Sequence, residues 1–191
     1  MGEAEGRALP GRVRLRKSVA LIGMMGAGKT AVGTALARRL SVPFLDSDAE
    51  IEAAARMRIA EIFARDGEAF FRRKEAQVIA RLVQGPPCVL STGGGAWLQE
   101  ENRRTIRAHG VAVWLDADPE VLWQRVRHKD SRPLLRTADP RATLEALHDE
   151  RRPVYARADL RVRSEGQMPI SAMVERVVAA LATRPDVLKG A

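Results

Sequence analysis

The residues best suited to chemistry in this sequence lie in a glycine-rich segment near its amino end. Their pattern is Gly23-x-x-x-x-Gly28-Lys29-Thr30, directly behind the apolar run 18–23. Glycines let successive backbone N–H groups turn toward one anion, and a following helix adds its own free N–H groups. A lysine at this position reaches the β- and γ-phosphates of a nucleotide, and the next hydroxyl ligates Mg²⁺. The segment therefore predicts a loop, known as a P-loop, that holds a nucleoside triphosphate with Mg²⁺.

The same glycines have a second interpretation as a dinucleotide-binding fingerprint. Gly26-x-Gly28-x-x-Ala31 fits its spacing, and acidic residues follow about twenty residues later. Three details favour the P-loop. The preceding strand is predicted to end early, which leaves a longer loop than a dinucleotide turn needs. A dinucleotide site also has no use for Lys29 or for the hydroxyl of Thr30. An ordinary glycine-rich turn is the third and least favoured interpretation.

Two carboxylates follow the second apolar run, as Asp46 and Asp48 in the segment DSD. If the strand continues through Asp48, alternation directs both side chains to one face. One carboxylate is then available to Mg²⁺, and the other accepts a proton from a substrate hydroxyl. The competing interpretation makes Asp48 the N-cap of a helix that continues through Glu50 and Ile51. Beside a P-loop, we expect the functional role.

Three consecutive glycines, 93–95, and several arginines are the remaining candidates. A glycine triplet at a strand end indicates positive φ or a close backbone approach to a ligand. Arg132 lies in the polar segment 128–140, which has two prolines and no clear period and is typical of a lid. An arginine in a lid stabilises charge on a transferred phosphoryl group. Arg151 or Arg152 could meet an anionic substrate, whereas Arg73 is expected on the surface. Together these residues predict a kinase that acts on a small, negatively charged alcohol.

The elements that must position these residues alternate between short apolar runs and helical patterns. Strands are expected at 18–23, 42–46, 87–92, 111–116 and 159–163, and helices between them, one of them starting at Pro119 with Asp118 as N-cap. This alternation predicts a three-layer α/β/α fold with a mostly parallel sheet, whose ligands bind at the carboxyl ends of the strands. We expect one domain over 18–184, with a lid at about 128–140, a flexible tail at 1–17 and a second tail at 185–191.

Composition narrows the class of protein further. The chain of 191 residues is 46% hydrophobic, enough for the core of one domain. Cys88 is the single cysteine and lies in an apolar run, so we expect a packed core thiol and a reducing compartment. No apolar stretch has the length of a membrane span, and no signal peptide is visible. The net charge of +8 is spread along the chain, and only 4% of residues are aromatic. We therefore expect a cytoplasmic monomer with no membrane or nucleic-acid partner.

Taken together, these segments resemble the shikimate kinases over nearly the whole chain from Lys17 onward. The resemblance rests on GMMGAGKT, FLDSDAEIE, IAEIFARDGEAFFRRKE, STGGGA, SRPLL and ERRPVY, in the family's order and spacing. It implies a P-loop kinase fold and ATP-dependent phosphorylation of the 3-hydroxyl of shikimate, in aromatic amino acid biosynthesis. The alternatives are a gluconate kinase, a non-catalytic nucleotide-binding module and a nucleic-acid-binding protein. FRRKE and GGGA favour shikimate over gluconate as the acceptor.

The resemblance also implies roles for individual residues. Lys29, Asp48 and Arg132 would be catalytic, with Asp48 as the candidate base. ATP would contact Gly26, Ala27, Gly28, Lys29, Thr30, Ala31, Arg125, Arg132 and Gln167. Shikimate would contact Asp48, Arg72, Gly94, Gly95 and Arg151, with the two arginines on its carboxylate. Mg²⁺ would lie by Thr30 and, through water, by Asp46.

Overall fold

The computed structural model of the protein describes residues 14–128, 133–166 and 168–190. Two residues expected at the nucleotide site, Arg132 and Gln167, lie outside these ranges. Of the segment expected as a lid, the structure describes residue 128 and residues 133–140, which include the short 3₁₀ helix η2 (Pro133–Leu135).

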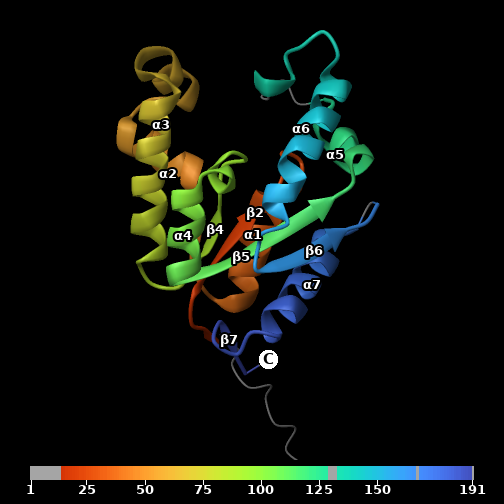
Figure 1. The fold of residues 1–191 in the computed structure, drawn as a ribbon. Coiled ribbons are helices and arrows are strands. Elements are labelled where there is room, and N and C mark those ends of the chain that lie inside the picture. Colours follow the sequence, from red (N-terminus) through yellow and green to blue (C-terminus); the bar gives the residue numbers. More distant parts are fainter. Residues whose placement is uncertain (1–13, 129–132, 167, 191) are drawn as a thin grey trace, which may run out of the picture.

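Five parallel strands form the central sheet, in the order β3-β4-β2-β5-β6 (Figure 1). They are β2 (Ser18–Ile22), β3 (Phe44–Asp46), β4 (Val89–Ser91), β5 (Gly110–Ala117) and β6 (Leu160–Ser164). Every residue of β2 and β5 is buried, as expected for parallel strands covered on both faces. The chain leaves β2 toward β3 and β4 on one side and later toward β5 and β6 on the other. The carboxyl end of β2 is therefore the point at which such sheets bind ligands.

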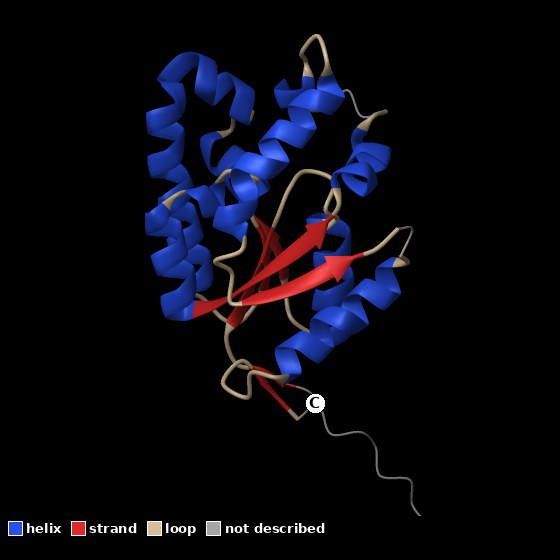
Figure 2. Cartoon of the chain, turned by 45° about the vertical axis from the view of Figure 1, so that its right-hand side comes forward, coloured by secondary structure: helices blue, strands red, loops and turns tan. Residues whose placement is uncertain are grey.

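Helices cover both faces of this sheet and complete the three-layer α/β/α fold that the sequence predicted (Figure 2). α1 contacts β2, β3 and β4, and it packs beside α7, which contacts β6; α4 contacts β5 and packs against α3. The helices are α1 (Lys29–Leu40), α2 (Ser47–Ala55), α3 (Ile59–Val83), α4 (Glu100–His109), α5 (Pro119–Val126), α6 (Pro140–Tyr155) and α7 (Ile170–Ala182), with the 3₁₀ helix η1 (Ala96–Leu98). Asp118 and Pro119 begin α5 as predicted. Over the described ranges, no helix combines the length and the apolar character of a membrane span.

The core lies between the sheet and its helices, and it fixes how closely α1 approaches the strands. A Cβ on Gly33 of α1 would lie 2.6 Å from a ring carbon of Phe44 on β3, so only glycine lets the helix pack this closely. Cys88 is 1% exposed, which confirms the prediction of a packed core thiol. α3 is interrupted at Gly67, whose φ of 80° and ψ of 170° are not helical. This interruption divides α3 into a shorter first part and a longer second part.

A second, two-stranded sheet joins the two ends of the described chain. β1 (Arg14–Leu15) pairs antiparallel with β7 (Leu188–Lys189), although the sequence analysis assigned both segments to tails. The Lys17 ammonium group lies 2.9 Å from a carboxylate oxygen of Asp186 and adds an ion pair. Leu15 and Leu188 are buried, which explains the pairing, because their apolar side chains extend the main core. Two-residue strands are too short to produce a detectable period in a sequence.

Candidate active site

A cavity of about 1270 Å³ opens at the carboxyl ends of the strands, between the P-loop, α2, α3 and α6. Ligand pockets usually measure about 300–1000 Å³, so this one has room for two substrates side by side. Most of the predicted site residues line it, namely Gly26, Gly28, Lys29, Thr30, Ala31, Asp46, Asp48, Arg72, Gly94, Gly95, Arg125 and Arg151. Ala27 is an exception, because it is 2% exposed and its N–H donates to the Met24 carbonyl oxygen at 3.1 Å.

The P-loop occupies residues 23–28, between the end of β2 and the start of α1. Gly26 and Gly28 have φ of 81° and 92°, in the left-handed region that side chains rarely adopt. Gly28 is the N-cap of α1, so the free N–H groups of the helix face the cavity. The Lys29 ammonium group donates to the carbonyl oxygens of Gly23 at 2.8 Å and Met24 at 3.0 Å, which holds its charge at the mouth of the loop.

Asp46 is the last residue of β3, and Asp48 lies in the first turn of the helix that follows it. The strand ends at Asp46, as the expected range 42–46 predicted, so the condition of a strand that continues through Asp48 is not met. The competing interpretation of Asp48 as the N-cap is wrong, because Asp46 is itself the N-cap of α2. The physical reason is local: Asp46 Oδ1 accepts hydrogen bonds from the N–H groups of Asp48 at 3.0 Å and Ala49 at 3.3 Å. Both carboxylates still line the cavity, one from the cap and one from the first helical turn.

The environment of Asp48 changes its basicity. Burial raises the pKa of the Asp48 carboxyl above its usual range, and the neighbouring Asp46 raises it further. The positive charges of Lys29 and Arg72 act in the opposite direction without cancelling the rise. A carboxylate with a raised pKa is a stronger base than an exposed aspartate.

The glycine triplet 93–95 is the point at which three separate elements meet. From α2, the Ser47 hydroxyl accepts a hydrogen bond from the Gly93 N–H at 3.2 Å, and Asp48 Oδ1 lies 2.7 Å from where a Gly93 Cβ would be. The other two elements bring guanidinium groups to the same turn. Arg72 of α3 lies within 2.7 Å of a Cβ built on Gly95, and Arg151 of α6 lies 3.7 Å from one built on Gly94.

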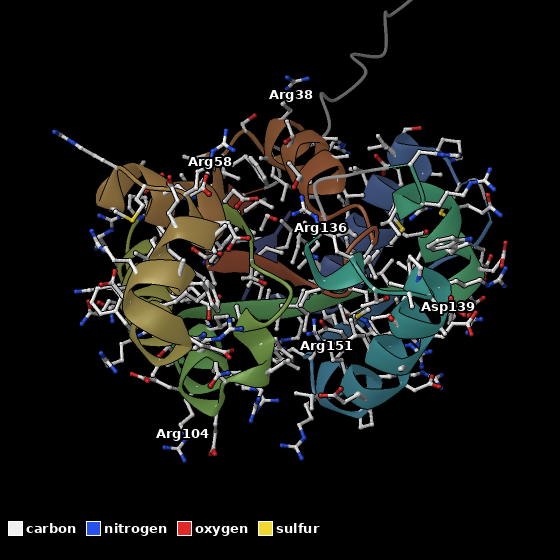
Figure 3. All side chains as sticks on the ribbon, turned by 90° about the horizontal axis from the view of Figure 1, so that it is seen from above. Arg38, Arg58, Arg104, Arg136, Asp139 and Arg151 are labelled. Carbon is white, nitrogen blue, oxygen red and sulfur yellow. The ribbon has the colours of Figure 1, made fainter. Side chains whose placement is uncertain are left out.

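Arg151 reaches this turn from the opposite side of the cavity. Figure 3 shows it between the α3 side and the α6 side of the molecule, whereas Arg38 and Arg104 point outward. Its Nε is buried and has no hydrogen-bond partner among the described residues. A buried guanidinium nitrogen without a partner is costly, so this atom indicates a place for an anionic ligand. The adjacent Arg152 is exposed, and Arg73 is exposed as predicted.

Arg72 is held by a carboxylate that the sequence analysis did not identify. Its Nη1 lies 2.8 Å from Oε2 of Glu75, one helical turn away and only 1% exposed. Burial raises the pKa of the Glu75 carboxyl, and the Arg72 guanidinium offsets part of that rise. The sequence did contain a signal, because Glu75 falls on the apolar stripe of Phe71, Val78 and Leu82. A charged residue on a buried stripe indicates a paired charge.

Arg125 of α5 connects the P-loop to β6. Its Nη1 donates to the Gly26 carbonyl oxygen at 3.3 Å, and its Nη2 donates to the Ser164 hydroxyl at 3.1 Å. Burial lowers the pKa of the guanidinium, which indicates partial removal from water. The planar side chain therefore lies beside the P-loop, at the end of the cavity away from the glycine triplet.

The donor atoms at the P-loop fit a magnesium ion. Thr30 contributes a hydroxyl and Asp46 a carboxylate to the same cavity, and hard cations such as Mg²⁺ take oxygen ligands. Within the described ranges, no group of three or more His, Cys, Asp or Glu side chains could hold a metal. A P-loop Mg²⁺ needs few protein ligands, because phosphate oxygens and water supply the rest.

Comparison with known proteins places this chain in a family. The family model described as shikimate kinase matches residues 25–182. The chain belongs to the shikimate kinase family. The shikimate kinase of Ruegeria pomeroyi is 69% identical over 179 residues, which cover 94% of this chain and 92% of the relative. That of Cereibacter sphaeroides is 68% identical over 176 residues, 92% of this chain and 88% of the relative.

Solved structures agree with the family assignment. The shikimate kinase from Acinetobacter baumannii in complex with shikimate has a TM-score of 0.81 and 35% identity, and the match covers 87% of this chain and 93% of that one. A gluconokinase from Sinorhizobium meliloti 1021 has a TM-score of 0.58 at 20% identity, a likeness that concerns the fold alone. These findings confirm the resemblance seen in the sequence, the P-loop kinase fold, and the interpretation of the protein as an ATP-using kinase of the shikimate pathway.

Proposed function

We propose that the protein transfers the γ-phosphoryl group of ATP to the 3-hydroxyl of shikimate, giving shikimate 3-phosphate and ADP. The meeting of Asp48, Arg72 and Arg151 at the glycine triplet, in the same cavity as the P-loop, is the observation that carries this proposal. A substrate with one carboxylate and several hydroxyl groups requires two cationic side chains for the carboxylate and a base for the reacting hydroxyl. It also requires a stretch of backbone that it can approach closely. This combination is what the acceptor side of the cavity offers.

On the nucleotide side, the N–H groups of the P-loop and of the α1 N-terminus bind the phosphates of ATP. Lys29 exchanges its two carbonyl partners for β- and γ-phosphate oxygens, and Arg125 contacts the adenine. The roles of Arg132 on the transferring group and of Gln167 near the adenine follow from the family resemblance, as does the backbone contact at Ala27. All three belong to the proposal.

On the acceptor side, Arg72 and Arg151 hold the shikimate carboxylate through charge-assisted hydrogen bonds. Asp48 orients the 3-hydroxyl and takes its proton. The hydroxyl oxygen forms a bond to the γ-phosphorus as the bond between that phosphorus and the β–γ bridging oxygen breaks, and ADP leaves with the electron pair. Lys29 and Arg132 stabilise the charge on the transferring group, so catalysis depends mainly on position and electrostatics.

Thr30 and Asp46 would hold the Mg²⁺ ion, the first directly and the second through water. When bound, Mg²⁺ neutralises charge on the β- and γ-phosphates. A lid formed from about 128–140 would exclude water during transfer and limit hydrolysis of ATP. A monomeric state and a cytoplasmic location are part of the same proposal, and size-exclusion chromatography with light scattering tests the first.

A coupled assay of ADP release tests the proposed reaction directly. We expect ADP formation that depends on shikimate and on Mg²⁺, with gluconate in place of shikimate giving only the background rate. Folded protein that releases no ADP with shikimate would overturn the proposal. Equal rates with gluconate would show that the acceptor has been misassigned while the kinase chemistry holds.

A further inference from the structure

The position of Arg151 depends on how α6 is held against the glycine triplet. α6 packs against η1, η2 and α5, and its last turn carries Val154 and Tyr155 toward the segment 94–97. Arg151 lies one helical turn before Tyr155, so both side chains project from the same face of α6. Whatever fixes this turn of α6 also fixes the guanidinium that faces the cavity.

Two partly buried hydrogen bonds join the last turn of α6 to the segment that begins with the glycines. The Tyr155 hydroxyl donates to the Gly94 carbonyl oxygen at 2.7 Å. In return, the indole N–H of Trp97 donates to the Val154 carbonyl oxygen at 3.0 Å. Tyr155 and Trp97 are each 1% exposed, so the two donor side chains are shielded from water. The two bonds run in opposite directions between the same two segments, which fixes both their separation and their register.

The segment 94–98 is itself held in place by hydrogen bonds from side chains of α4. Asn102 Nδ2 donates to the Ala96 carbonyl oxygen at 2.9 Å, and Arg103 Nη1 donates to those of Trp97 and Leu98, both at 2.8 Å. Asn102 and Arg103 are buried. The carbonyl groups of η1 are therefore held by α4, and α6 contacts a segment that is already fixed from another side.

The Tyr155 hydroxyl contacts the same glycine that Arg151 approaches. Burial raises the pKa of the hydroxyl, and the charge and hydrogen bonding of the Arg151 guanidinium offset part of the rise. The hydroxyl is bonded to the carbonyl oxygen of Gly94, and Arg151 Nη1 lies 3.7 Å from a Cβ built on the same glycine. Through Tyr155, the position of the Arg151 guanidinium therefore depends on the position of the glycine turn.

We propose that Tyr155 and Trp97 are positioning residues for the acceptor substrate, which lock α6 to the glycine triplet and so hold Arg151 where it meets the substrate carboxylate. This inference rests on the proposed function, because it assumes that Arg151 binds that carboxylate. It assigns neither residue any contact with the reacting atoms. Its consequence is specific: loss of either hydrogen bond weakens binding of the carboxylate and leaves ATP binding unchanged.

The test compares Tyr155→Phe and Trp97→Phe with the unmodified protein, because each removes one donor and keeps an aromatic ring. We expect the KM for shikimate to rise about tenfold in each, the size of effect expected when a hydrogen bond near a charged group is lost. The KM for ATP should stay the same, and kcat should fall by less than about threefold. Ser18→Ala is the matched control, since it removes a buried hydroxyl that accepts from the Cys88 N–H at 3.3 Å, at the opposite end of β2.

Two further measurements separate this inference from a loss of stability and from the proposed function. With the neutral carboxamide of shikimate, calorimetric Kd values of the unmodified protein and of Tyr155→Phe should agree, because the carboxylate is absent. Arg151→Ala combined with Tyr155→Phe should raise the KM for shikimate no further than Arg151→Ala alone. If Arg151→Ala raises this KM while both aromatic variants leave it unchanged, the positioning role is wrong and the proposed function stands. If Arg151→Ala itself has no effect, the assignment of the carboxylate site fails.

Discussion

Replacing Gly95 with alanine should displace Arg72 without damaging the fold. A Cβ at this position would lie 2.7 Å from Nη2, 2.9 Å from Nη1 and 3.1 Å from Cζ of Arg72. Ordinary contact begins at 3.4 Å, so the guanidinium must withdraw by at least 0.7 Å, the difference between 3.4 and 2.7 Å. The φ of −94° and ψ of −10° at Gly95 suit alanine, so the backbone has no reason to change.

The cost of this displacement should appear in substrate binding and not in stability. A misplacement of about 1 Å in a binding group can cost about a hundredfold in catalysis. We expect kcat/KM for shikimate to fall by a factor of about 10 to 100, with the KM for ATP unchanged. The free energy of unfolding should change by less than about 1 kcal/mol as long as the shifted guanidinium keeps its ion pair with the buried Glu75, because the clashing atoms are the far end of a flexible side chain.

Steady-state kinetics with shikimate and ATP, together with urea denaturation, measure both quantities. Gly85→Ala is the control, since its Cβ would lie 3.4 Å from the Leu82 carbonyl oxygen, in ordinary contact and outside the cavity. Arg72→Ala sets the largest effect that displacement of Arg72 can have. If Arg72→Ala raises the KM for shikimate and Gly95→Ala does not, the geometric reasoning at this turn is refuted.

Three other substitutions test separate parts of the site and of the fold. Lys29→Ala should lower kcat by about a hundredfold or more, because it removes a charge that stabilises the transferring group, and it should leave the circular dichroism spectrum unchanged; a near-normal kcat contradicts the role. Asp46→Asn removes a charge that raises the pKa of Asp48, so the acid limb of the kcat/KM profile should move to lower pH, and an unmoved limb argues against Asp48 as the base. Gly33→Ala brings a methyl group into the ring of Phe44 and should lower the free energy of unfolding by about 1–3 kcal/mol, measured by urea denaturation, with KM values unchanged.

The parts of the fold that the sequence predicted correctly are those with a strong local pattern. β2 and β5 are continuous apolar runs, and the glycine loop with its lysine and threonine has one favoured geometry, so both were predictable without tertiary information. The roles of the two aspartates in the DSD segment were not predictable from the sequence. The residue type alone does not distinguish an aspartate that ends a strand from one that caps a helix. Only the two hydrogen bonds that Asp46 accepts decide between them.

The side chains that hold the site together were the hardest to predict. Glu75 carried a signal, a charge on an apolar stripe, but its partner Arg72 could be named only once α3 was placed. Trp97 and Tyr155 have no sequence feature that distinguishes them from ordinary core residues, since their hydrogen bonds go to backbone carbonyls far away in the sequence. Backbone acceptors have no sequence signature, so contacts of this kind can be found only in a structure.

The contacts around the glycine triplet explain why three adjacent residues lack side chains here. Each one is approached by a different element: Gly93 by Asp48 of α2, Gly94 by α6, and Gly95 by Arg72 of α3. A side chain at the first position would clash with the Asp48 carboxylate, and one at the third would clash with the Arg72 guanidinium. At the second position it would occupy the space in front of Arg151. Phosphoryl transfer requires the acceptor hydroxyl to be placed within a fraction of an ångström. Elements from three separate parts of the chain reach that precision because all of them contact one short stretch of backbone, which α4 holds in place through η1.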